Sequence, residues 1–329
     1  MRKLIRLWLK HIFPKRIAKS FSKRISELLR NIRSTVPSEF NRRPRSLDDY
    51  KLWKATEFRT FLLYLGPVVL KGILDADMYK NFLTLHVAIS ILLNKTFCKE
   101  DHYLDYAGNL LKHFIYTFTK LYGKAYVSHN IHNLLHFVAD VRKFGILENF
   151  SCFRFENYMA TVKKLLRKGD KPLQQLSRRL GEIESVNTKC GKIKVSGIVL
   201  EKQHFDGPLH RKDNIIGQYK TLCNSLYMIH CGDERNNCCI LQNGEYVEME
   251  NIIQCEDETI IVIGKQLLNV QDLYDVPMKS SFLHINIVNK NNEMQTLNAW
   301  TLNYVAGKAW KIPYGEQFVV CSLIHTYRN

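Results

Sequence analysis

The spacing of apolar residues changes near residue 181, and this change divides the chain into two kinds of structure. From residue 47 to residue 126, apolar side chains recur at helical spacing. From residue 194 to residue 327, short β-type runs alternate with turns, and Asn243 followed by Gly244 is typical of a type I′ hairpin. The sequence therefore predicts an α+β chain: an all-α N-terminal domain followed by a small all-β domain, barrel-like or sandwich-like.

Basic residues are concentrated at the start of the chain. Residues 1–34 hold eleven Lys or Arg residues and one acid, Glu27, with apolar residues at helical spacing on both sides of Pro14. Three interpretations are open: a helix pair that packs on the rest of the domain, a helix that contacts nucleic acid, or a mitochondrial-type presequence. The boundaries that we predict are a basic amphipathic helical segment at 1–36, a helical domain at 37–180, a linker at 181–193 and a β-rich domain at 194–329.

The chain as a whole carries a formal net charge of +17 in 329 residues. Such an excess indicates a polyanionic partner, of which nucleic acid is the commonest, and a generally basic surface is the alternative. Nine cysteines at irregular spacings, without a secretory signal, indicate reduced thiols in a nuclear or cytosolic protein. No apolar run approaches the ~20 residues that span a bilayer, so we expect no transmembrane segment.

The stretch from residue 127 to residue 171 combines histidines, an acid and a basic run. His129, His132 and His136 are spaced to project from one face of a helix, either as metal ligands or as core groups bonded to the backbone. Glu156 follows in the aromatic frame FRFENYM, which we expect to desolvate its carboxylate in part; the alternative is an ordinary ion pair with Arg154 or a nearby lysine. The basic run comes next, either as phosphate contacts or as a solvated helix face: Lys163, Lys164, Arg167, Lys168 and Lys171.

Three separated blocks carry a resemblance to a known family. They are FNRRPRSLDDYKLWKATEFRTFLLYLGPVVLKG, HNIHNLLHFVADVRKFGILENFSCFRFENYM and KKLLRKGDKPLQQ, within residues 38–179, and they resemble the C-terminal part of CACTA-type transposases and their domesticated relatives. Those enzymes are DDE nucleases: three acids hold two divalent metal ions, and a CxxC pair and a histidine pair hold zinc. The resemblance implies that Glu156 is the third acid and that His132 and His136 are the zinc pair, with His129 outside it.

Part of the family's chemistry is missing from the match. In the family, the first two acids and the CxxC pair lie upstream of this region, whereas this chain starts 37 residues before Ser38 and contains no CxxC. One carboxylate cannot hold two Mg²⁺ ions, and two histidines are half of a zinc site, for which Cys98, Cys152 or His129 are candidate substitutes. We expect a catalytically incomplete protein whose ancestral activity was metal-dependent DNA strand transfer, with Mg²⁺ bound only if a complete core is assembled.

The connector before the first long helical pattern is also basic. Arg42, Arg43 and Arg45 are candidates for phosphate contacts or for a nuclear localisation signal. Together with the basic run they predict a DNA-binding protein of the nucleus, with the cytoplasm as the alternative and a related full-length transposase as a further candidate partner. Two other functions stay open: a protein-interaction scaffold that uses the β-rich domain, and a nuclease subunit whose partner supplies the missing acids.

Overall fold

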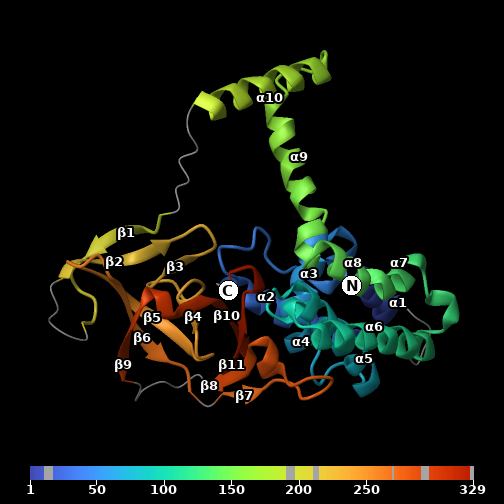
Figure 1. Ribbon diagram of the computed structural model, residues 1–329. Coiled ribbons are helices and arrows are strands. Elements are labelled where there is room, and N and C mark those ends of the chain that lie inside the picture. The colour runs from blue at the N-terminus through green and yellow to red at the C-terminus, as the bar shows by residue number, and fades with distance from the viewer. Residues whose placement is uncertain (11–17, 190–196, 210–214, 269, 290–295, 327–329) are drawn as a thin grey trace.

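The computed structural model describes residues 1–10, 18–189, 197–209, 215–268, 270–289 and 296–326 (Figure 1). A helical region comes first and an antiparallel β-sheet region second, which confirms the predicted α+β class. Of the helices in these ranges, none is both long and apolar enough to cross a lipid bilayer. The helices of the first region are α1 (Arg2–Lys10), α2 (Lys19–Ile32), α3 (Ala55–Thr60), the π-helical turn η3 (Phe61–Leu65), α4 (Gly66–Val69), α5 (Ala76–Leu93), α6 (Asp101–Tyr122), α7 (His129–His132), α8 (Phe137–Phe144), α9 (Phe153–Leu165) and α10 (Pro172–Lys189).

The helical region is built around α5, which is buried on nearly all of its faces. Asp75 caps its start, because the Asp75 carboxylate accepts a hydrogen bond from the backbone N–H of Asp77 at 3.1 Å. The neighbouring helix α6 ends at Gly123, whose φ of 98° favours glycine. A helix that is apolar all round belongs inside a core, so α5 sets the positions of the helices around it.

Helices α1 and α2 pack into the same core. Trp8 is 1% exposed, and its indole N–H donates to the hydroxyl of Tyr122 at 2.8 Å. Ile25 and Leu29 of α2 are fully buried, whereas the lysines and arginines of α2 are exposed. The first interpretation of residues 1–34, a helix pair that packs on the rest of the domain, is therefore confirmed for the described part of that segment.

The β region forms one eleven-stranded antiparallel network. Its strand order is β1-β2-β5-β4-β10-β11-β8-β7, with β3 beside β2, β6 beside β5 and β9 beside β6. The strands are β1 (Val199–His204), β2 (Ile215–Cys223), β3 (Met228–His230), β4 (Cys238–Leu241), β5 (Tyr246–Cys255), β6 (Ile260–Gln266), β7 (Gln271–Asp272), β8 (Ile285–Asn289), β9 (Leu297–Thr301), β10 (Val305–Tyr314) and β11 (Gln317–Ser322). The predicted hairpin joins β4 to β5, but Gly244 has a positive φ of 86° and Asn243 does not, so the turn is not type I′.

The helical and β regions share one hydrophobic core. Leu273, Trp310 and Val319 of the β region belong to the same buried cluster as the residues of α5. His86 of α5 also bonds through Nε2 to the hydroxyl of Tyr274 at 2.9 Å. The sheet has smaller clusters of its own. The change in periodicity near residue 181 therefore separates two kinds of secondary structure that complete one core.

Helices α9 and α10 form an arm that extends away from the rest of the protein, with α10 across the far end of α9 (Figure 1). None of the side chains described in these two helices is buried. The segment predicted as a linker at 181–193 is helical over residues 181–189, because α10 continues to Lys189. Glu182 stabilises that continuation through ion pairs with Arg178 at 3.0 Å and Arg179 at 2.8 Å, about one turn earlier. The remaining linker residues from 190 to 193 lie outside the described residues.

Candidate nucleic-acid interface

The histidine cluster lies on the surface. His129, His132 and His136 follow one another along α7, the short helical turn η6 (Asn133–His136) and the start of α8, and all are exposed. The rings of His132 and His136 have centroids 5.6 Å apart, and Nε2 of His129 contacts Nδ2 of Asn133 at 3.1 Å. The alternative that these histidines are core groups bonded to the backbone is therefore wrong.

The donors around the pair His132 and His136 do not complete a metal site. In the described parts of the chain, no three His, Cys, Asp or Glu side chains are grouped so that they could hold a metal ion. Burial raises the pKa of the Cys98 thiol to about 11, and that thiol donates to the backbone oxygen of Ile91 at 3.4 Å. The residues present do not fit a tetrahedral zinc ion, so zinc stays a prediction that needs further ligands.

Glu156 lies in the first turn of α9 and is exposed. Its aromatic neighbours are exposed as well, Phe155 to 69% and Tyr158 to 53%. The expectation that this frame desolvates the carboxylate is therefore wrong, because α9 leaves the protein body and Phe155, Glu156 and Tyr158 face water. Phe153 makes the contact with the body, where the Arg59 guanidinium lies 5.3 Å from the centre of its ring. A single exposed carboxylate does not fit two Mg²⁺ ions.

The bend between α9 and α10 is held by one side chain. Gln175 of α10 accepts hydrogen bonds through Oε1 from the backbone N–H groups of Arg167 at 3.1 Å and Lys168 at 3.3 Å. Its Nε2 donates to the backbone oxygens of Lys168 at 3.0 Å and of Asp170. We call residues 163–171 the elbow. Gln175 was not a sequence candidate, because a glutamine in a polar run carries no signal of which backbone it will bond.

The cations predicted for the basic run are all exposed at the elbow. They are Lys163, Lys164, Arg167, Lys168 and Lys171. Within the described residues none of them forms an ion pair, and Asp170 is the only acid between residues 163 and 179. Arg178 and Arg179 further along α10 differ, because both form ion pairs with Glu182. The elbow is therefore a positively charged, solvent-facing surface at the end of an arm, suited to bind phosphate groups.

The connector arginines divide into two groups. Arg42 and Arg43 are exposed, as phosphate contacts require. Arg45 instead pairs with buried Glu57, donating from Nε to Oε1 at 2.8 Å and from Nη2 to Oε2 at 2.7 Å. Nη2 of Arg45 also donates to the backbone oxygen of Leu52 at 2.6 Å. The prediction that Arg45 contacts nucleic acid is not supported, because this guanidinium holds the connector against α3.

Comparison with known proteins finds one family model that matches part of the chain. A family model described as a domain of unknown function (DUF8592) matches residues 203–323, which run from the end of β1 to just after β11. Neither a curated protein nor a solved structure matches the chain. The family match lies on the β region, whereas the elbow and the histidines lie outside it.

Proposed function

We propose that this chain is a transposase-derived protein that binds DNA through the elbow and does not cut DNA strands by itself. The resemblance of three sequence blocks to CACTA-type transposases supports the origin. The observation that carries the binding is the elbow itself, whose exposed cations lack ion pairs within the described residues and whose backbone is held by Gln175. A DNA partner makes the nucleus the proposed location.

The physical basis of the contact is the release of counterions from DNA phosphates. Such contacts position the protein on the backbone without reading base sequence. Each neutralised phosphate steepens the dependence of log K on log salt concentration by ~0.9, so contacts from all elbow cations predict a slope of about −4.5. The affinity would then fall about 500-fold between ~50 and ~200 mM salt.

Fluorescence anisotropy with a labelled DNA duplex tests this proposal on the full chain. We expect replacement of the five elbow cations by glutamine to weaken binding by at least about 100-fold at low salt and to flatten the salt slope. A control variant removes the same charge from exposed cations of α2 and the turn after it: Lys19, Lys23, Arg24, Arg30 and Arg33. Equal losses in both variants would mean that net charge attracts DNA and that the elbow is not the site. Binding without any salt slope would refute phosphate contacts altogether.

A nuclease subunit is the second candidate function, and the exposure of Glu156 favours it. The carboxylate and the apolar side chains of Phe155, Tyr158 and Met159 beside it are open to a protein partner. A partner that brings the missing acids would assemble a metal-binding set around Glu156. The test is Mg²⁺-dependent nicking after addition of the upstream part of a related transposase. Nicking that persists in Glu156→Gln would rule this function out.

Zinc at His132 and His136 is the remaining proposal from the resemblance. Metal analysis of purified protein is the test, with Glu156→Gln as a control variant that leaves both histidines in place. Any zinc held there, with its further ligands supplied from elsewhere, should be lost in the double variant His132→Ala and His136→Ala. Zinc content that is zero, or unchanged by that double variant, would remove these histidines as ligands.

A further inference from the structure

A cavity of about 610 Å³ lies in the helical region, away from the elbow. Its volume falls within the ~300–1,000 Å³ that is typical of small-molecule sites. The walls come from α1, α3, η3, α5, α6 and the segment that runs from α7 to the start of α9. Most of the lining is apolar, and its floor consists of Leu62, Leu85, Ile89, Leu93, Phe114 and Ile131. A lining of this kind favours an apolar ligand body.

On one polar wall of the cavity, an arginine and a glutamate form an ion pair, so their charges cancel. Arg59 donates to both carboxylate oxygens of Glu148, from Nη1 at 3.3 Å and from Nη2 at 2.5 Å. Both side chains are about 30% exposed, so the pair borders both solvent and the cavity. Because each charge is compensated within the protein, this wall does not select a charged ligand.

Lys3 of α1 provides the uncompensated charge. Its half-buried side chain lines the cavity and forms no ion pair within the described residues. Burial lowers the pKa of Lys3, and the nearby charge of Arg6 lowers it further. Both causes disfavour the ammonium form, and an anionic group placed beside Lys3 would act against them by favouring that form. Exposed Arg2 adds positive charge to the same wall.

We propose that this cavity binds one long-chain fatty acid as a free monomer, with its alkyl chain along α5 and α6 and its carboxylate beside Lys3. The apolar floor selects the chain, and charge complementarity selects the head group. The elbow takes no part in this binding, since no residue of the cavity lining belongs to it. The two proposals therefore succeed or fail independently.

Dodecanoate, kept below its micelle concentration, is the probe for calorimetric titration of the full chain. We expect saturable binding of one molecule per chain, with an affinity that falls about fourfold for each methylene removed. Dodecanol has the same chain without the charge, and we expect it to bind about tenfold more weakly. Absence of saturable binding, no dependence on chain length, or equal binding of the alcohol would overturn the proposal. So would attachment to anionic phospholipid vesicles in the absence of monomer binding.

Variants locate the site. Lys3→Gln should reduce the preference for the acid over the alcohol several-fold, because Arg2 remains, whereas Lys10→Gln, at an exposed position of the same helix, should keep the full preference. Ile89→Trp should fill the cavity and block binding. Methyl NMR of the unsubstituted protein locates the ligand without a substitution that could disturb folding. The methyl resonances of Ile89 and Ile131 should shift when dodecanoate is added, and those of Ile240 in β4 should not. An unchanged preference in Lys3→Gln, or shifts that avoid Ile89 and Ile131, would overturn the assignment.

Discussion

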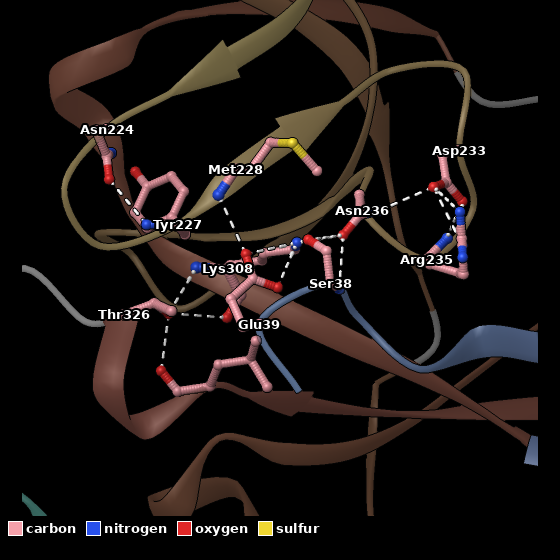
Figure 2. Close-up of polar contacts among 11 residues, drawn as sticks. Ser38, Glu39, Asn224, Tyr227, Met228, Asp233, Arg235, Asn236, Lys308 and Thr326 are labelled. Carbon is pink, nitrogen blue, oxygen red and sulfur yellow. Dashed lines mark hydrogen bonds and ion pairs between the residues drawn. The ribbon is translucent and has the colours of Figure 1, made fainter. Parts of the chain in front are cut away.

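The buried ion pair between Glu39 and Lys308 joins the N-terminal connector to the sheet, and its removal should be among the most costly single changes in the chain. The Lys308 side chain, on β10, is fully buried, and Glu39 is 10% exposed. Nζ of Lys308 donates to Oε1 of Glu39 at 2.8 Å, to Oε2 at 2.7 Å and to Oδ1 of Asn236 (Figure 2). Glu39 also accepts from the backbone N–H of Met228 at 3.1 Å, and Ser38 bonds to Asn236.

Glu39→Ala would leave the ammonium of Lys308 buried beside a neutral amide. Burial already lowers the pKa of Lys308, and Glu39 opposes that effect, so the variant loses the main group that stabilises the charge. Breaking a buried pair from one side costs ~3–5 kcal/mol. Lys308→Met removes the charge itself, so the double variant should be less destabilised than the sum of the single changes. It should still lose ~1–3 kcal/mol, because the N–H of Met228 loses its acceptor.

Urea unfolding followed by far-ultraviolet circular dichroism and by tryptophan fluorescence measures these free energies. The two signals should coincide, because helices and sheet share a core. Glu201→Ala, at an exposed position of β1, is the control and should change stability by less than ~0.5 kcal/mol. A loss below ~1 kcal/mol in Glu39→Ala, or additive losses in the double variant, would refute the buried-charge argument.

Three further predictions concern a buried histidine, a sheet glycine and the elbow clamp. Burial lowers the pKa of His86 to about 4 from 6.5, so between these values the unfolded chain binds more protons than the folded one. Stability should therefore fall by up to ~3 kcal/mol as pH drops from 6.5 to 4, and urea titrations of His86→Gln should lack this part of the slope. Gly264→Ala should cost ~1–3 kcal/mol or more in thermal unfolding, because its Cβ would overlap the Glu248 carbonyl, whereas Gly169→Ala, with open space around it, should be neutral. Gln175→Leu should weaken DNA binding about tenfold with an unchanged salt slope, because the cations remain while their backbone loosens; a flattened slope would contradict this explanation.

The order of secondary structure could be predicted from local pattern, because periodicity reports directly which faces are buried. The helix pair of residues 1–34 and the hairpin at Gly244 are local in this sense. The prediction of a type I′ turn was wrong. Gly244 takes a positive φ, but Asn243 keeps a negative φ, and an Asn-Gly pair accommodates this combination just as well. The predicted end of the helix before residue 182 was also wrong. The ion pairs of Glu182 with Arg178 and Arg179 offset part of the helix cost of Gly181, and the sequence shows both signals at once.

The sequence could predict which residues belong to the candidate site, but it could not predict which of them are exposed or which partners they bind. The elbow cations are exposed as a basic run predicts, yet Arg45, which lies three positions after exposed Arg42 in the same basic connector, is bound to Glu57. The prediction that the Glu156 carboxylate is desolvated was wrong for a related reason. Aromatic neighbours desolvate a carboxylate only when their helix packs against something, and that depends on contacts far along the chain. The pairing of Glu39 with Lys308, 269 positions apart, has no local signal either.

Because the arm formed by α9 and α10 extends from the protein body, DNA affinity and folding stability should respond to different substitutions. Measuring both quantities in the same variants tests whether the elbow is the whole DNA interface. No side chain described in α9 and α10 is buried, whereas Glu39 and Lys308 belong to the buried body. The elbow variant should therefore lose DNA affinity with little change in its urea midpoint, because its side chains are exposed and form no ion pairs within the described residues. Glu39→Ala should do the reverse, with a lower urea midpoint and an unchanged affinity per folded molecule at low urea. If Glu39→Ala weakened binding while circular dichroism still showed a fully folded protein, the DNA would have to contact the body as well, and the elbow could not be the whole interface.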